Sequence, residues 1–226
     1  MFIHTNRMYG GETMARNKFP EETIKRILEV SFELFMEKGY ENTSIQDIIN
    51  KLGDLTKGAI YYHFKSKEEI LMAVADASYK ETEEEMCKIR DNKTLNGLEK
   101  LKKIFYILLE SPHQYQMLSI GPQLLKNPKL LTIQLQGSIE EFAPLYIQPI
   151  LEQGIKDGSI QTEYSKEFAE VVTLLINIWL NPMVFKISPK DMLNKCKFFR
   201  EILVGLGVDL FDEQMINYFV QYVKYI

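Results

Sequence analysis

The chain contains 226 residues with a formal net charge of −4, and 46% of its residues are hydrophobic, so it can bury a substantial core. A protein that coats nucleic acid over its whole surface would be strongly basic, which this chain is not. Its most apolar span, residues 171–180, is about half as long as the ~20 residues that a membrane helix needs. The totals therefore argue against a membrane partner and against a protein that is basic throughout.

Cysteine usage and the first residues bear on the cellular compartment. Cys87 and Cys196 lie far apart inside helical patterns, which favours a reducing compartment over a disulfide framework. Residues 1–14 carry no apolar run of the kind that a secretory signal needs, and we expect them to form a polar, disordered tail. These features predict a soluble protein of the cytoplasm.

The first helix is expected to begin after Pro20, with acidic residues in its first turn, and to end at Gly39. A capping box follows, in which Thr43 bonds forward and Gln46 reaches back. It begins a second helix of about two turns, whose inward stripe has helical spacing. The stripe consists of Ile45, Ile48, Ile49 and Leu52.

Residues 53–55 break the second helix, and Thr56 is placed to cap a third short helix over residues 56–64. A second capping box begins at Ser66 and starts a long fourth helix that runs toward Arg90. A helical wheel of the third helix places Ile60 and Phe64 on one inward face.

The remaining face of the third helix carries Lys57, Gly58, Ala59, Tyr61 and Tyr62. Gly58 and Ala59 have almost no side chain, so a partner can approach the backbone closely. Phenol and ammonium groups can bind phosphates, and residues 51–67 hold four lysines against Asp54 alone. This combination predicts a helix that enters the major groove of DNA.

The sequence over residues 20–71, about a quarter of the chain, resembles the TetR family of bacterial transcription regulators. The matching run is Thr43-Ser44, Ile45, Asp47-Ile48, Lys57-Gly58, Ile60-Tyr61-Tyr62-His63-Phe64 and Lys65-Ser66-Lys67-Glu68-Glu69-Ile70-Leu71. The resemblance implies an all-α protein with a three-helix helix-turn-helix head over residues 15–65. It also implies a helical body over residues 66–226 that binds an effector and forms the dimer.

The resemblance further implies a homodimer that binds a palindromic operator in double-stranded DNA, most commonly as a repressor, and that an unidentified small molecule releases. By position it implies phosphate contacts by Thr43 and Ser44, base contacts by Thr56, Lys57, Gly58 and Ala59, backbone contacts by Tyr61, Tyr62 and His63, and a phosphate anchor at Lys67. One departure is the turn Gly53-Asp54-Leu55, which is one residue longer than usual and brings a negative charge near the groove.

The pattern stays helical beyond residue 95. The expected helices are 95–110, 114–126, 128–143, 144–157, 165–185, 190–206 and 211–225, with prolines between or inside them. Residues 165–185 are apolar on more than one side, so this helix packs against a second molecule or lies at the centre of a monomer. The resemblance implies the first alternative, and the candidate dimer residues are Phe168, Val172, Leu175, Met192, Phe199, Ile202 and Leu203.

The body also offers candidates for an effector cavity, which mix aromatic walls with a few polar groups. They are Phe105, Tyr106, Tyr115, Met117, Gln134, Phe142, Tyr146, Asn177, Trp179 and Asn181. Asn177 stands out because an amide on an otherwise apolar helix needs a hydrogen-bond partner. For each residue taken singly, packing in the core is the alternative interpretation.

Enzyme chemistry has no support in the sequence. The three histidines are dispersed, and no Gly-rich phosphate loop, nucleophile elbow or metal-ligand cluster is present, so we expect neither cofactor nor metal. The remaining alternative is a helical interaction scaffold whose aromatic head binds a protein rather than DNA, since aromatic residues are common at protein interfaces.

Overall fold

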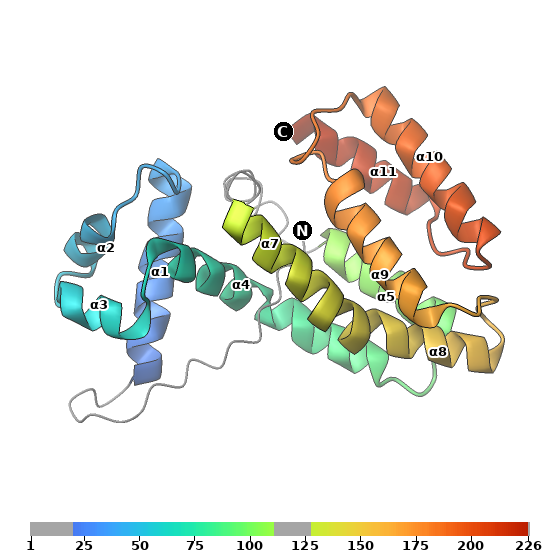
Figure 1. Cartoon of the computed structure of the whole chain (residues 1–226), viewed down its shortest axis with the longest axis horizontal. Coiled ribbons are helices and arrows are strands. Elements are labelled where there is room, and N and C mark those ends of the chain that lie inside the picture. The colour runs from blue at the N-terminus through green and yellow to red at the C-terminus, as the bar shows by residue number, and fades with distance from the viewer. Residues whose placement is uncertain (1–19, 111–127, 226) are drawn as a thin grey trace.

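The computed structural model describes residues 20–110 and 128–225, and all elements within them are helices. The head contains α1 (Pro20–Lys38), α2 (Ile45–Leu52) and α3 (Lys57–His63), and α4 (Lys67–Arg90) runs from it into the body (Figure 1). The elements of the body are α5 (Gly97–Glu110), α7 (Pro128–Gly137), η1 (Ser138–Ile147), α8 (Gln148–Asp157), α9 (Ser165–Leu174), η2 (Leu175–Trp179), α10 (Pro189–Gly205), α11 (Glu213–Tyr222) and η3 (Val223–Tyr225). The all-α class predicted from the sequence is confirmed.

The helix expected over 114–126 and the tail over 1–14 lie outside the described residues.

The head is held by a small apolar core of its own. Ile27, Leu34 and Phe35 of α1 meet Ile48 of α2 and Ile60 of α3, and all are buried. Helices as short as α2 and α3 are marginal in isolation, so this packing provides most of their stability. The inward face predicted for the third helix is thus confirmed.

α4 belongs to both cores. Its first half, from Ile70 to Ala75, packs in the head cluster, whereas Met86 lies in the body cluster with Tyr79 packed against it. Any rotation of α4 relative to the body therefore moves the head with it.

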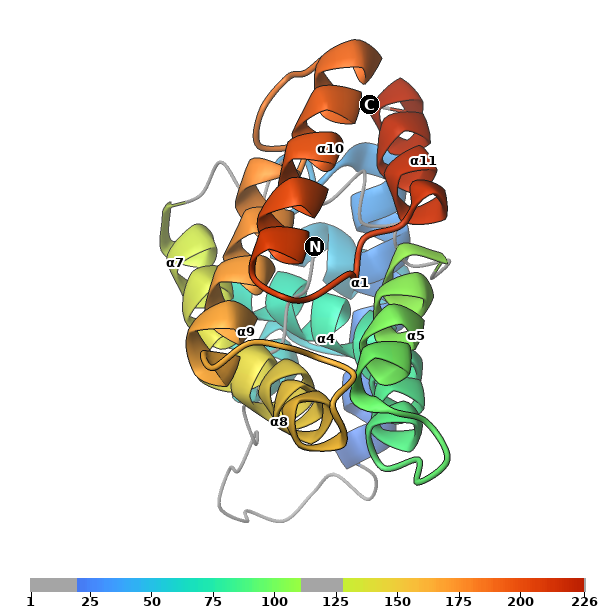
Figure 2. The same ribbon diagram turned by 90° about the vertical axis from the view of Figure 1, so that its right-hand side faces the viewer.

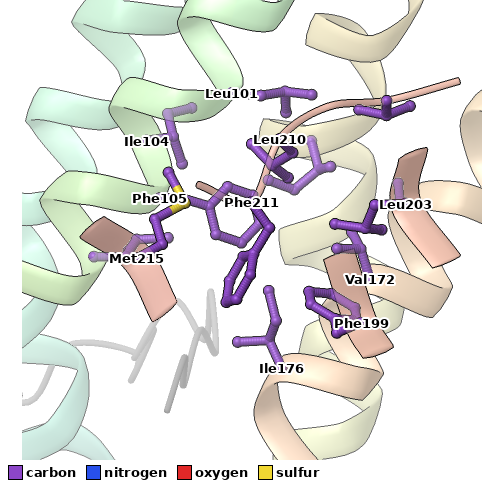
Figure 3. Packing of buried hydrophobic residues seen from close by; sticks show 14 of the residues in the cluster. Leu101, Ile104, Phe105, Val172, Ile176, Phe199, Leu203, Leu210, Phe211 and Met215 are labelled. Carbon is purple, nitrogen blue, oxygen red and sulfur yellow. The ribbon is translucent and has the colours of Figure 1, made fainter. Parts of the chain in front are cut away.

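The body encloses a larger apolar core (Figure 3). Viewed from the body end, α5, α8, α9, α10 and α11 surround a common centre (Figure 2). Phe105 on α5, Phe199 on α10 and Phe211 before α11 are fully or almost fully buried there, and the rings of Phe199 and Phe211 meet edge to face at 5.1 Å. Aromatic pairs prefer this geometry because ring edges carry partial positive charge.

The helix break expected near residue 144 is wrong. Pro144 lies inside η1, a π-helical stretch that continues directly into α8. A proline ring clashes with the carbonyl four residues earlier and cannot donate to it. The wider π turn, with its i→i+5 bonding, relieves both problems without ending the helix.

The helix expected over 165–185 ends at Trp179 instead, with Leu180 as its C-cap. Asn181 ends it, because its Nδ2 donates to the carbonyl of Asn177 at 3.0 Å and its Oδ1 accepts from the Met183 amide at 2.9 Å. Local side-chain bonds of this kind compete with continued helix. The sequence did not reveal this helix end, because apolar residues continue beyond Asn181.

Two glycines lie where α5 and α8 cross in the body. A Cβ built on Gly97 of α5 would lie 2.3 Å from the Cα of Gly154 on α8, a distance that side-chain carbons do not adopt. The two backbones therefore touch directly, and Gly97 has no room for a side chain.

Candidate nucleic-acid interface

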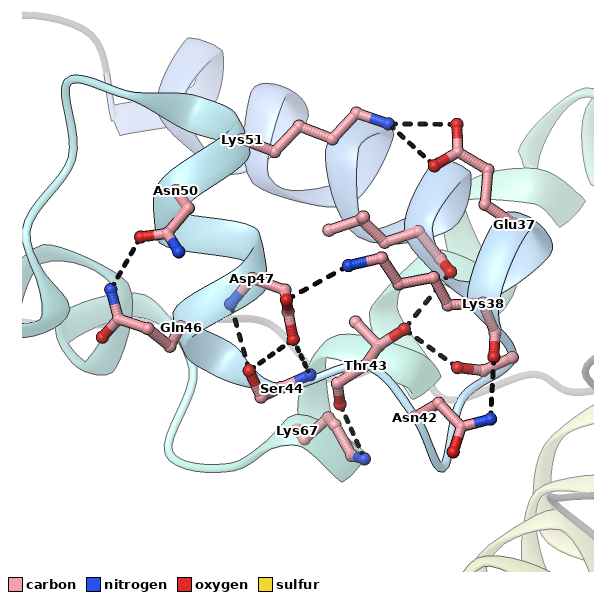
Figure 4. Close-up of polar contacts among 12 residues, drawn as sticks. Glu37, Lys38, Asn42, Thr43, Ser44, Gln46, Asp47, Asn50, Lys51 and Lys67 are labelled. Carbon is pink, nitrogen blue, oxygen red and sulfur yellow. Dashed lines mark hydrogen bonds and ion pairs between the residues drawn. The ribbon is translucent and has the colours of Figure 1, made fainter.

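The start of α2 is capped one residue later than the sequence pattern suggested. Ser44, not Thr43, is the N-cap, and its hydroxyl accepts from the Asp47 amide while the Asp47 carboxylate accepts from the Ser44 amide. These bonds hold the pKa of Asp47 at about 2, with Lys38 adding an ion pair at 3.1 Å (Figure 4). The expected pairing of Thr43 with Gln46 is wrong.

Thr43 faces inward. It is 1% exposed, and its hydroxyl donates to the carbonyls of Leu34 and Gly39 at 3.2 and 2.9 Å. Its side chain therefore ties the end of α1 to α2 and is not available for the phosphate contact that the resemblance implied. Ser44 remains exposed at the helix start.

The lengthened turn between α2 and α3 is stabilised from outside the turn. Gly53 has a positive φ of 77° and caps α2, a conformation that favours glycine. Asp54 forms a two-pronged ion pair with Arg26 of α1, with N–O distances of 2.7 and 2.9 Å. The guanidinium lowers the pKa of Asp54 and offsets its negative charge. The extra residue therefore adds less negative charge to the groove-facing surface than the sequence suggested.

α3 presents its aromatic residues to solvent. Thr56 caps the helix by accepting from the Ala59 amide, and Ile60 is buried at its inner side. Tyr61 and Tyr62 are 38% and 53% exposed. Large aromatic residues exposed side by side on a short helix suit a binding surface better than a structural role.

Gly58 has no reason within the fold to be glycine. Its φ is not positive, and a Cβ there would meet only Thr56 Oγ1, at 3.8 Å. Glycine in a helix is less favourable than alanine by about 1 kcal/mol. The cost is explained if another molecule must approach the backbone at this point.

The lysines of the head differ in whether their ammonium groups form ion pairs. Lys51 is paired with Glu33 and Glu37 of α1 at 3.1 and 3.2 Å, so its ammonium faces α1. In the described part of the chain, Lys57 and Lys65 form no ion pair. The Lys57 ammonium lies 5.8 Å from the Tyr61 ring. The free positive charge is thus concentrated beside the exposed tyrosines.

Lys67 has a structural role that the sequence did not reveal. Its ammonium donates to the carbonyls of Tyr40 and Thr43 at 2.8 and 2.9 Å and lies 4.1 Å from the centre of the Tyr40 ring. It therefore joins the start of α4 to the α1–α2 connection. The phosphate anchor implied by the resemblance has to compete with these two bonds.

His63 lies at the edge of the same surface. Its ring meets Tyr62 edge to face at 5.0 Å, and partial burial lowers the pKa of His63 below its usual value. The neutral imidazole is therefore favoured at neutral pH and offers a hydrogen bond rather than a positive charge.

Two amides on α2 were not recognised as surface candidates from the sequence. Gln46 and Asn50 are exposed one turn apart, and Gln46 Nε2 donates to Asn50 Oδ1 at 2.9 Å. The sequence pattern placed Gln46 in the capping box at the start of α2. Its i, i+4 spacing with Asn50 was the signal that both lie on one outer face.

The effector candidates do not form one set. Phe105, Phe142 and Tyr146 are buried in the body core, and Gln134 and Asn177 are buried with them. Others have structural bonds: Tyr106 donates to Asp212 at 2.7 Å, Tyr146 to Glu83 at 2.6 Å, and Asn181 forms the helix stop described above. The Trp179 ring lies near the surface beneath the Lys195 ammonium, 5.0 Å away. Tyr115 and Met117 lie outside the described residues.

Most of the candidate dimer residues pack into the protein's own core. Val172, Met192 and Phe199 are at most 1% exposed and belong to the protein's own core, and Phe168 and Leu203 are also buried there. Only Leu175 and Ile202 are partly exposed. Periodicity identified the stripe but not the molecule against which it packs.

α9 and α10 also carry an exposed apolar surface. Tyr164, Val171, Phe198, Val204 and Leu206 are between 44% and 62% exposed. A groove of about 190 Å³ runs between these helices. It is lined by Thr162, Tyr164, Glu167, Phe168, Val171, Leu175, Ile202, Leu203 and Leu206. An apolar surface of this kind typically marks a protein interface.

None of the helices in the described ranges is long and apolar enough to cross a membrane. Among the same residues, no group of three or more His, Cys, Asp or Glu side chains could hold a metal ion.

Comparison with known proteins connects both parts of the chain to one family. Residues 27–74 match the sequence model of the tetR family of bacterial regulatory proteins, and residues 127–202 match that of a tetracyclin repressor-like C-terminal domain. The transcriptional regulator YerO of Bacillus subtilis, which is uncharacterized, is 44% identical over 55 residues, or 24% of this chain and 19% of YerO. The repressor KstR2 of Rhodococcus jostii is 29% identical over 151 residues, covering 63% of this chain and 70% of KstR2.

A solved structure extends the likeness to the fold. The TetR/AcrR-family regulator from Thermobifida fusca superimposes with a TM-score of 0.53 at 25% identity, covering 72% of this chain and 87% of that one. The chain spans only 19% to 25% of the length of the first three curated relatives that it matches. Since matches reach both the head and the body, the chain belongs to the TetR family of bacterial transcriptional regulators.

Proposed function

We propose that the chain is a DNA-binding transcriptional repressor that acts in the cytoplasm as a homodimer and is released from its operator by a small molecule. The outward face of α3 carries the proposal. It combines exposed Tyr61 and Tyr62, a Lys57 that forms no ion pair with the residues described, and an open backbone at Gly58. These groups suit duplex DNA, because phosphates accept from hydroxyl and ammonium donors while the bare helix start approaches the bases.

The DNA contacts are assigned to Ser44, Thr56, Lys57, Gly58, Ala59, Tyr61, Tyr62 and His63. We place them in a DNA-binding unit over residues 15–65. Thr43 is left out because its hydroxyl is bonded inside the head, and Lys67 because its ammonium is already bonded to two carbonyls. Repression rather than activation is supported by the relative KstR2, which is named a repressor.

The homodimer is supported by the groove between α9 and α10. Its lining is apolar along Val171, Leu175 and Ile202, and exposed Phe198 and Leu206 extend the apolar surface. The same helix faces of two copies can cover one another across a two-fold axis, which is how most homodimers associate. A dimer would then present two α3 helices to two half-sites of a palindrome.

Selection from a pool of random duplex DNA tests the proposed function. We expect enrichment of a two-fold symmetric sequence whose half-sites are separated by one helical turn or a multiple of it. The double variant Tyr61→Ala/Tyr62→Ala should enrich nothing while keeping the wild-type melting temperature, because both side chains are exposed. Failure of the wild type to enrich any duplex would contradict the proposal and favour the protein-binding scaffold.

A further inference from the structure

Gln134 is a buried amide with no hydrogen-bond partner among the described residues. Its side chain is 2% exposed, and in the described part of the chain neither Nε2 nor Oε1 forms a hydrogen bond. Burial removes the hydrogen bonds that a polar side chain makes to water. Buried polar side chains therefore nearly always have a partner that replaces those bonds. Thr173 Oγ1, on the helix α9 that packs against η1, is also buried and has no hydrogen-bond partner within residues 20–110 and 128–225.

The position of Gln134 connects it to the helix that carries the head. Its neighbour Ile133 packs against the head cluster, which includes Ile70 to Ala75 of α4. Farther along the same continuous helix, Tyr146 of η1 donates to Glu83 of α4 at 2.6 Å. α7 thus packs against the head cluster at Ile133, and η1 contacts α4 at Tyr146. Gln134 is the sequence neighbour of the first of these contacts.

The chemistry of the side chain limits what can satisfy it. A carboxamide offers two N–H donors and one acceptor oxygen, and it carries no charge. Its complement is a neutral group that both accepts and donates, such as a primary amide or a lactam. A carboxylate or ammonium group would gain no ion pair from Gln134 and would lose its hydration on burial.

We propose that Gln134 is the residue that recognises the effector, and that the effector presents a neutral amide-like group to it on an apolar body. This inference rests on the proposed function and names the ligand class and the regulatory contact. An occupant bonded to Gln134 lies beside the contact of Ile133 with the head cluster, to which the first half of α4 belongs. Binding there can therefore favour one orientation of α4, and of the head, over another.

The variant Gln134→Met keeps the length of the side chain and removes both unsatisfied atoms. In the absence of ligand, its melting temperature should rise by roughly 2–4 °C. The matched control is Gln153→Met, because the Gln153 amide is fully used: its oxygen accepts from Lys100 at 2.6 Å and its nitrogen donates to the Leu95 carbonyl at 3.0 Å. That variant should melt roughly 2–4 °C below the wild type.

Three probes with the same chain, octanamide, octanoate and octylamine, then test the ligand class by thermal shift. Of the three probes, only octanamide should raise the melting temperature of the wild type and of Gln153→Met. It should leave the melting temperature of Gln134→Met unchanged. The proposal is overturned if Gln134→Met is destabilised without ligand, since the amide then has a partner within the chain. It is equally overturned if octanamide stabilises no variant, or if its shift persists in Gln134→Met.

Binding of the selected duplex separates this inference from the proposed function. Gln134→Met should bind the duplex as the wild type does, and octanamide should release only the wild type and Gln153→Met. Release of Gln134→Met by octanamide would overturn the inference while leaving DNA binding intact. A wild type that binds no duplex would instead contradict the proposed function, whatever the melting temperatures show.

Discussion

At the scale of single residues, Gly58 and Lys67 have opposite explanations. Gly58 sits in open space, where the fold gains nothing from glycine, so its explanation lies in a partner molecule. Lys67 is held by two carbonyls and an aromatic ring, so its explanation lies within the fold. The motif predicted an interface role for both, because sequence order alone does not show which side chains are already bonded.

Replacing Gly58 by Ala should separate stability from DNA binding. The free energy of unfolding should rise by about 0.5–1 kcal/mol, because alanine loses less backbone entropy in a helix. Affinity for the selected duplex should fall roughly tenfold, since an added methyl group in a close contact forces the surfaces apart. Urea unfolding and a binding titration measure the two effects. A variant that is more stable and binds equally well would remove Gly58 from the contact.

Replacing Lys67 by Met should lower the free energy of unfolding by about 1–2 kcal/mol, because the Tyr40 and Thr43 carbonyls lose their charged donor. The matched control is Lys65→Met, whose exposed ammonium has a single bond, to the Tyr61 carbonyl. That variant should stay within about 0.5 kcal/mol of the wild type. If Lys67→Met keeps full stability and loses only DNA affinity, Lys67 is the phosphate anchor implied by the resemblance.

At the scale of elements, hydrophobic spacing and capping residues predicted most helices of the described ranges. The short helices of the head were predicted closely, because Gly39, Gly53, Thr56 and Ser66 mark their ends. The π-helical stretch around Pro144 was not predicted, because proline normally signals a break and the packing that keeps the helix continuous is tertiary. Which side of α9 and α10 packs inward could not be predicted from the sequence either, since both sides of α9 are apolar.

The contact between α5 and α8 gives the strongest stability prediction. Gly97→Ala should destabilise the protein by about 3 kcal/mol, because the new methyl group would meet the Gly154 backbone and the two helices must separate. Urea unfolding followed by circular dichroism measures this. Gly58→Ala is the control of opposite sign, as the same substitution at an open position should stabilise. A loss below about 0.5 kcal/mol would show that the helices do not touch at Gly97.

At the scale of the whole molecule, the head and the body share α4, and the exposed apolar faces lie on the far helices of the body. This arrangement separates the proposed dimer surface from the proposed DNA surface and leaves α4 as the connection between them. Effector binding beside α4 can then change the spacing of two heads without altering either surface directly.

The proposed homodimer can be tested by substitutions at the apolar groove between α9 and α10. Val171→Asp places a charge on an exposed groove residue and should convert the protein to a monomer, seen by light scattering after gel filtration. Ile155→Asp is the matched control, since Ile155 is 39% exposed on α8, outside the groove, and should leave the dimer intact. A Val171→Asp dimer would place the interface elsewhere.

The salt dependence of duplex binding tests most directly that the open face of α3 binds DNA. The slope of log K against log salt should be steep and negative, at about −0.9 for each phosphate contact. Lys57→Met should reduce its magnitude by about 1. Lys51→Met should leave the slope unchanged, because Lys51 is already paired with Glu33 and Glu37. A slope near zero for the wild type, or equal slopes for Lys57→Met and the wild type, would contradict this account.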